Sequence, residues 1–83
     1  MPDLSLEIAT PDKLLVKETV SQVEVPGKDG YMGILPGHAA LISELKEGIL
    51  KYTASGKVSQ LRITGGFVEV RDDKVRVLAD SDK

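Results

Sequence analysis

Apolar and polar residues alternate with a period of two along most of this chain. Leu4, Leu6 and Ile8 alternate with Ser5 and Glu7, and the same spacing returns in residues 58–64 and 74–78. Successive side chains of a β-strand point to opposite faces, so this period predicts strands with one face toward a core. It constrains the fold to an all-β class.

Turn signals divide the alternating segments into short pieces. Proline fixes φ and glycine permits positive φ, so residues 10–12, 26–30, 36–38 and 55–57 are predicted turns. Asp72-Asp73 predicts a tight turn of its own. Many short strands separated by turns are typical of an antiparallel sandwich or barrel.

Two segments are less regular. Residues 39–46 have helix propensity but are too few for a helix to stand alone, so we expect an extended or irregular segment. Gly65-Gly66 interrupts a strand pattern. Such a pair usually marks a bulge or a close approach of two backbones.

Length and composition exclude several classes. The chain has 83 residues, which predicts a single domain over 1–83, and it has no cysteine for a disulfide or thiolate site. The net charge is −2, and the aromatic residues are only Tyr31, Tyr52 and Phe67, which argues against nucleic-acid binding. No apolar run approaches the ~18–20 residues of a membrane span, and the N-terminal residues lack the basic region and apolar run expected of a signal peptide.

His38 is the only histidine, and it could in principle serve a serine nucleophile as a general base. Neither a nucleophile elbow nor a second histidine supports that hypothesis. A loop histidine with a structural hydrogen bond, or one at a partner surface, is the favoured interpretation. We therefore predict neither a catalytic nor a metal-binding residue.

Residues 27–33 contain two further patterns, a glycine spacing of three and an adjacent tyrosine and methionine. Gly27, Gly30 and Gly33 lack the following helix that a phosphate-binding loop needs, and they are interpreted as turn residues. Tyr31 and Met32 are adjacent, so in a strand they face opposite sides. At most one faces the core, which leaves the other for a contact surface.

Four collinear segments resemble the epsilon subunit of F-type ATP synthases. Residues 29–41 read DGYMGILPGHAAL and are similar to the signature of that family, in which an acidic-glycine turn leads to Pro-Gly-His-Ala. Residues 4–11, 63–70 and 75–80 resemble its first strand and turn, its glycine-pair strand and the end of its N-terminal domain. The match covers essentially the whole chain in order.

The resemblance implies a two-sheet antiparallel β-sandwich of about ten short strands. It implies a non-catalytic rotor-stalk subunit that docks on the gamma subunit and the c-ring and couples proton flow to ATP synthesis. In the family, the Pro-Gly-His turn lies near the polar loops of the c-ring. The partner-binding residues carried over from the motif, with Ser43 added for the gamma-facing surface, are Asp29, Gly30, Tyr31, Met32, Pro36, Gly37, His38 and Ser43.

Two departures qualify that expectation. Many members have a polar or acidic residue where Tyr31 stands, so the ring contact here would be less electrostatic, although Asp29 could pair with ring arginines. The C-terminal helical hairpin is missing, so we expect no ATP binding, no cofactor and no restraint of ATP hydrolysis. Either a truncated or a naturally short epsilon chain would explain this.

The resemblance implies a location peripheral to an energy-transducing membrane. That membrane would be the bacterial plasma membrane, on its cytoplasmic face, or the thylakoid, on its stromal face. A generic β-sandwich protein-binding module is the alternative function, and a small hydrolase built on His38 is a more remote one. Substitution of His38 by alanine separates these hypotheses, since only the hydrolase would lose an activity.

Overall fold

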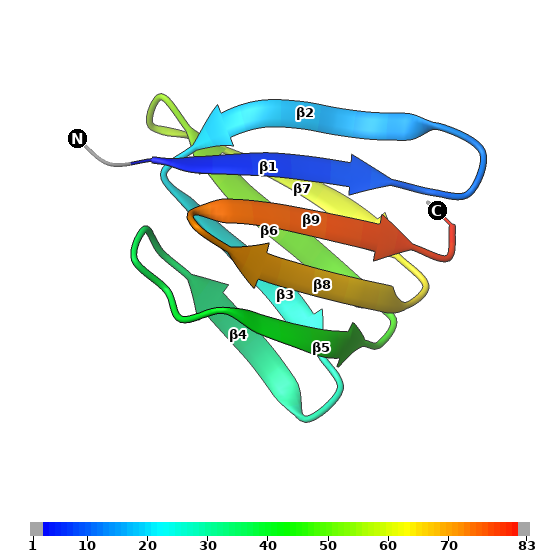
Figure 1. Cartoon of the computed structure of the whole chain (residues 1–83). Coiled ribbons are helices and arrows are strands. Elements are labelled where there is room, and N and C mark those ends of the chain that lie inside the picture. Colours follow the sequence, from blue (N-terminus) through cyan, green and yellow to red (C-terminus); the bar gives the residue numbers. More distant parts are fainter. Residues whose placement is uncertain (1–2, 82–83) are drawn as a thin grey trace.

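A computed structural model describes residues 3–81, which form nine β-strands joined by short turns (Figure 1). The strands are β1 (Leu4–Ala9), β2 (Leu14–Val20), β3 (Gln22–Gly27), β4 (Gly30–Ile34), β5 (Leu41–Leu45), β6 (Gly48–Ala54), β7 (Lys57–Ile63), β8 (Gly66–Arg71) and β9 (Lys74–Ala79). The all-β prediction is confirmed. The segment 39–46, expected to be extended or irregular, contains β5.

The period-two pattern places one face of each strand in the interior. In β8 and β9 every second residue is buried and the residues between them are exposed. Leu4, Leu6 and Ile8 of β1 are buried in the same way. The alternation in the sequence therefore encodes a sheet with one apolar and one solvated face.

The strands are arranged in two layers (Figure 1). A front layer has the order β2-β1-β9-β8-β5, and a back layer has the order β4-β3-β6-β7. The hydrogen-bonded path passes from one layer to the other through the single β3–β5 pair of Gly27 and Leu45. The two-layer β-sandwich is confirmed, with nine strands in residues 3–81 instead of about ten.

One strand pair departs from the antiparallel expectation. β1 and β9 are parallel, with Leu6 beside Val75 and Ile8 beside Val77. Hairpins set antiparallel pairing between neighbours in sequence, but β1 and β9 come from opposite ends of the chain. The relative direction of β1 and β9 depends on how the whole front layer is assembled. No local turn signal in the sequence reveals it.

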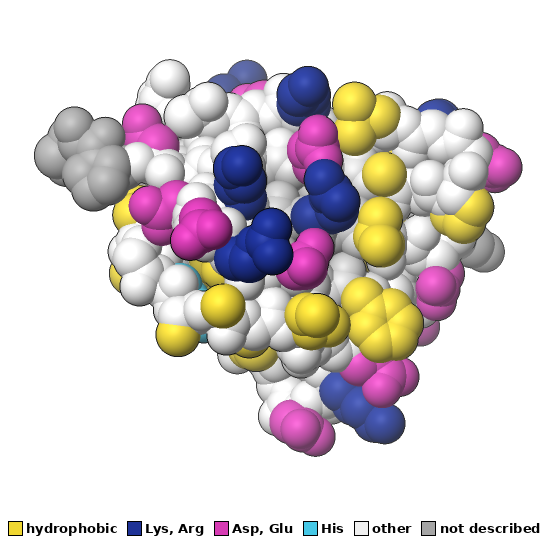
Figure 2. Space-filling view, in the orientation of Figure 1, with side chains coloured by type: hydrophobic (Ala, Val, Ile, Leu, Met, Phe, Trp, Pro, Cys, Tyr) yellow, Lys and Arg dark blue, Asp and Glu magenta, His cyan; other side chains and the backbone are white. Residues whose placement is uncertain are grey.

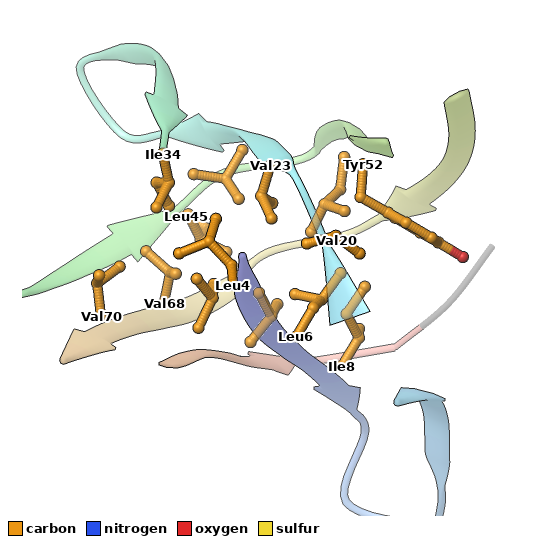
Figure 3. Close-up of a cluster of buried hydrophobic side chains, with 14 of the residues drawn as sticks. Leu4, Leu6, Ile8, Val20, Val23, Ile34, Leu45, Tyr52, Val68 and Val70 are labelled. Atoms are coloured by element: carbon orange, nitrogen blue, oxygen red, sulfur yellow. The ribbon is translucent and has the colours of Figure 1, made fainter. Parts of the chain in front are cut away.

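The core lies between the layers and is aliphatic except at its edge (Figure 3). Tyr52 is at that edge, with its hydroxyl directed away from the cluster. Each fully buried Val, Leu or Ile contributes about 1.5–3 kcal/mol relative to exposure. The buried side chains are Leu4, Leu6, Ile8, Val20, Val23, Val25, Ile34, Leu45, Leu50, Tyr52, Ile63, Val68, Val70, Val75, Val77 and Ala79.

The glycine pair marks a close approach of two backbones, as expected. Gly66 has φ +137°, and a Cβ placed on it would overlap the carbonyl oxygen of Leu78 and lie 2.9 Å from Cα of Ala79. Both contacts are with backbone of the paired strand β9, which cannot move aside alone. Only glycine allows β8 and β9 to pair at this register.

We expect Gly66→Ala to lower the free energy of unfolding by about 2–4 kcal/mol, because it adds both backbone strain and a backbone clash. Urea denaturation monitored by circular dichroism measures this. Gly33→Ala is the matched control, since a Cβ there meets nothing within 4 Å. Equal stability of the two variants would contradict the close-approach explanation.

Candidate partner-binding surface

The motif at residues 29–41 is divided by the strand that it contains. Asp29 lies in the turn before β4, whereas Pro36, Gly37 and His38 lie in the loop after it. These two segments are therefore at opposite ends of β4, about 16 Å apart at ~3.3 Å per residue (Figure 1). The predicted contact residues are not brought together in one loop.

Tyr31 and Met32 point to opposite faces of β4, which confirms that at most one faces the core. Met32 packs against the core, and Tyr31 is 52% exposed on the outer face of the back layer. The Tyr31 hydroxyl accepts a hydrogen bond from the backbone N–H of Ile49 at 3.1 Å. This bond ties the exposed ring to β6.

Pro36 and Gly37 occupy the centre of a tight turn. The N–H of His38 donates to the carbonyl of Leu35 at 3.0 Å, and Gly37 has φ +86°. Proline followed by a positive-φ glycine is the signature of a type II turn. The N–H of Gly37 donates outward, to Oδ1 of Asp73 at 2.7 Å, so the turn is fastened to the β8–β9 hairpin.

His38 is half-buried, and its ring contacts the adjacent backbone. Nδ1 lies 2.7 Å from the carbonyl oxygen of Ala39, and since that oxygen can only accept, Nδ1 carries the proton. Within residues 3–81 the structure shows no other hydrogen bond to this ring. The Ala39 carbonyl orients the ring, but no serine or other nucleophile is hydrogen-bonded to it within the described residues.

Ser43 lies on the inward side of β5. It pairs with Val68, which is fully buried, and its own side chain is half-buried. Its neighbour Ile42 faces outward and is 73% exposed. Ile42 and Glu44 are thus the β5 side chains on the outer face of the front layer.

An apolar patch covers one half of the outer face of the front layer (Figure 2). Phe67 of β8 and Leu78 of β9 stand directly opposite each other, both more than half exposed. With residues 9–11 they line a hollow of about 330 Å³. Together with Ile42 these residues are called the apolar patch below.

Charged side chains cover the other half of the same face (Figure 2). Lys17, Glu7, Arg76 and Glu69 follow one another across four adjacent strands with alternating sign. The Arg76 Nε and Glu7 Oε1 atoms are 3.4 Å apart. Exposed pairs of this kind contribute about 0–1 kcal/mol each, so the pattern offers orientation more than stability.

The outer face of the back layer is more mixed. Tyr31, Leu35 and Val58 are exposed there, and a hollow of about 420 Å³ lies over Gly33 and Ile34. Glu24 and Lys51 also line this hollow. It lacks the contiguous apolar pair that Phe67 and Leu78 form on the front layer.

Sequence reasoning overlooked the apolar patch, although a signal for it was present. Val68, Val70, Val75 and Val77 fix the inward register of β8 and β9. Phe67, which directly precedes Val68, and Leu78, which directly follows Val77, must then face outward. A large aromatic side chain on the solvated face of a strand is an indication of a binding surface.

Other kinds of site receive no support in the described part of the chain. No helix in residues 3–81 is long and apolar enough to cross a membrane. The same residues contain no group of three or more His, Cys, Asp or Glu side chains placed to hold a metal ion.

Comparison with known families gives a match over residues 3–82 to the β-sandwich domain of ATP synthase delta/epsilon chains. The chain is 53% identical over 75 residues to an ATP synthase epsilon chain of Koribacter versatilis. It is 52% identical over 81 residues to one of Solibacter usitatus. It covers 53% and 60% of their lengths, with 90% and 96% of its own residues aligned.

Solved structures agree with the fold. The chain aligns over its full length with 54% of a chain in the mitochondrial ATP synthase of Euglena gracilis, with a TM-score of 0.92 and 29% identity. It also aligns with a chain in the central stalk and c-ring structure of Tetrahymena thermophila. There the TM-score is 0.81 at 18% identity, covering 96% of this chain and 65% of the other.

We expect His38→Ala to change the free energy of unfolding by less than about 0.5 kcal/mol, because the ring lies outside the core and bonds only its own loop. Thermal and urea denaturation measure the change. The control is Leu50→Ala in the core, for which a loss of about 2–5 kcal/mol is expected. A comparable loss at His38 would assign the ring a structural role instead of a contact role.

Proposed function

This chain belongs to the family of the β-sandwich domain of ATP synthase delta and epsilon chains, and we propose that it is a non-catalytic rotor-stalk subunit. It docks on the gamma subunit and on the c-ring, and it thereby helps to couple proton flow to ATP synthesis. The observation that carries this proposal is the family match over residues 3–82. The apolar patch on the outer face of the front layer supports it.

The gamma subunit is the proposed partner of the front layer. Phe67 and Leu78 form a contiguous apolar pair, with Glu44 of β5 directly beside Phe67 and Ile42 at the next outward position along β5. Exposed apolar surface of this kind stabilises a complex when it is covered. The alternating charges beside the patch restrict the orientation in which a partner can approach.

The two ends of β4 serve different partners in this proposal. The resemblance implied a c-ring contact for the Pro36–His38 turn. We propose gamma for this turn instead, because it leads directly into β5 and its outward side chain Ile42. Asp29 lies at the opposite end and is exposed. It suits the cationic loops of a c-ring, with Gly30, Tyr31 and Met32 as its neighbours along β4.

The proposed location follows from the proposed partners. A subunit bound to the c-ring lies at the surface of an energy-transducing membrane without entering it. The cytoplasmic face of a bacterial plasma membrane and the stromal face of a thylakoid are the two locations considered. The curated relatives from Koribacter and Solibacter favour the bacterial location.

We expect Phe67→Ser to weaken binding to the gamma subunit at least roughly fivefold, because truncating an aromatic side chain at the centre of an interface costs more than ~1 kcal/mol. Isothermal titration calorimetry with purified gamma measures the affinity. Val58→Ser is the matched control: Val58 is 57% exposed against 54% for Phe67, but it lies on the back layer.

The outcomes of this titration are distinct. Loss of affinity only in Phe67→Ser supports docking through the front layer. Loss only in Val58→Ser would move the docking surface to the back layer. No binding by the folded unsubstituted chain would favour the alternative of a generic protein-binding module.

Single cysteine substitutions test which partner lies at each end of β4. In the assembled synthase we expect Asp29→Cys to crosslink to the c-ring and His38→Cys to crosslink to gamma when a short bifunctional reagent is added. Denaturing electrophoresis with subunit-specific antibodies identifies the products. The reverse pattern would exchange the two partners, and both cysteines linking to one subunit would contradict the separation.

A further inference from the structure

The β8–β9 turn has an aspartate, Asp73, at a position where glycine is favoured. Asp72 and Asp73 have φ of 52° and 60°, so both are in the left-handed region that a two-residue type I′ turn requires. The second position of this turn prefers glycine. The β6–β7 turn is of the same kind, and it has Gly56, with φ +77°, at the corresponding position.

Asp73 makes one contact that glycine could not make: its carboxylate accepts the N–H of Gly37 at 2.7 Å. Its backbone carbonyl accepts the N–H of Ser5 at 2.9 Å, and glycine at this position would keep that bond. The bond is short and has a charged acceptor, but it is exposed to solvent, so it contributes more to the position of the turn than to stability. The side chain thus joins two loops that are 36 residues apart in the sequence.

The Gly37 N–H has no acceptor inside its own turn. In a type II turn the closing bond is made by the fourth residue, here His38 to Leu35, and Pro36 has no N–H. The Asp73 carboxylate therefore accepts the Gly37 N–H, which points away from the turn. With that bond the position of the turn relative to β8 and β9 is defined.

We propose that Asp73 is a positioning residue that holds the Pro36–His38 turn against the β8–β9 hairpin, so that turn and hairpin form one rigid contact surface for gamma. The left-handed strain at Asp73 is retained because its carboxylate orders this surface before docking. An ordered surface loses less conformational entropy on binding. The inference rests on the proposed function for its partner, but the ordering of the turn is independent of that partner.

The decisive variant is Asp73→Gly in the whole chain. Glycine suits the left-handed position, so we expect the melting temperature to stay the same or rise. The Gly37 amide loses its acceptor, and its hydrogen exchange should accelerate at least roughly tenfold. The affinity for gamma should fall roughly threefold to tenfold, in proportion to the fraction of chains with the turn in place.

Two variants control for other effects. Asp72→Gly relieves the same kind of strain, but the Asp72 carboxylate is 85% exposed and lies 3.9 Å from Arg71, so neither exchange at Gly37 nor affinity should change. Asp73→Asn keeps an acceptor oxygen and tolerates positive φ. It should retain most of the protection at Gly37 and most of the affinity.

Nuclear magnetic resonance exchange, thermal melting and calorimetry with gamma separate the outcomes. Faster exchange with weaker binding at undiminished stability supports the proposal. Unchanged exchange at Gly37, unchanged affinity, or a parallel loss of stability and affinity would overturn it. If the unsubstituted chain does not bind gamma, the proposed function fails, and exchange at Gly37 alone decides whether Asp73 orders the turn.

Discussion

The sandwich depends on the apolar contact between the inner faces of its two layers. Most strand-to-strand hydrogen bonds act within one layer, and among residues 3–81 the strand pairing between the layers is limited to Gly27 with Leu45. The layers are otherwise held by aliphatic side chains from nearly every strand. A domain of this size buries only about 60–65% of the surface of its unfolded chain, so this contact has little excess stability.

The contact between the layers determines which side chains can bind a partner. Side chains on the inner face of each layer pack in the core and cannot contact another subunit. Outer positions, turns and loop ends remain for partners, as the apolar patch and the Pro36–His38 turn illustrate. Substitutions at Phe67 or His38 can therefore alter docking without the loss of core packing that a change at Leu50 would cause.

The strands and their inward faces could be predicted from the sequence because both follow from local alternation and turn chemistry. The parallel pairing of β1 with β9 could not, since it joins opposite ends of the chain. The motif suggested one contact loop, but five residues of β4 separate Asp29 from Pro36. The bond between Gly37 and Asp73 was invisible for the same reason: it depends on tertiary proximity, which sequence spacing does not show.

The position of β9 between β1 and β8 also has a consequence for biosynthesis. β1 leaves the ribosome first of the nine described strands, and β9 leaves last. Until β9 has emerged, the front layer is two separate pieces, each with an unpaired edge toward the gap. The nascent chain then exposes the inner faces of β1 and β8 to solvent and to other chains. Completion of the front layer therefore requires β9, and a chain that ends before residue 74 would leave the edges of β1 and β8 without their strand partner.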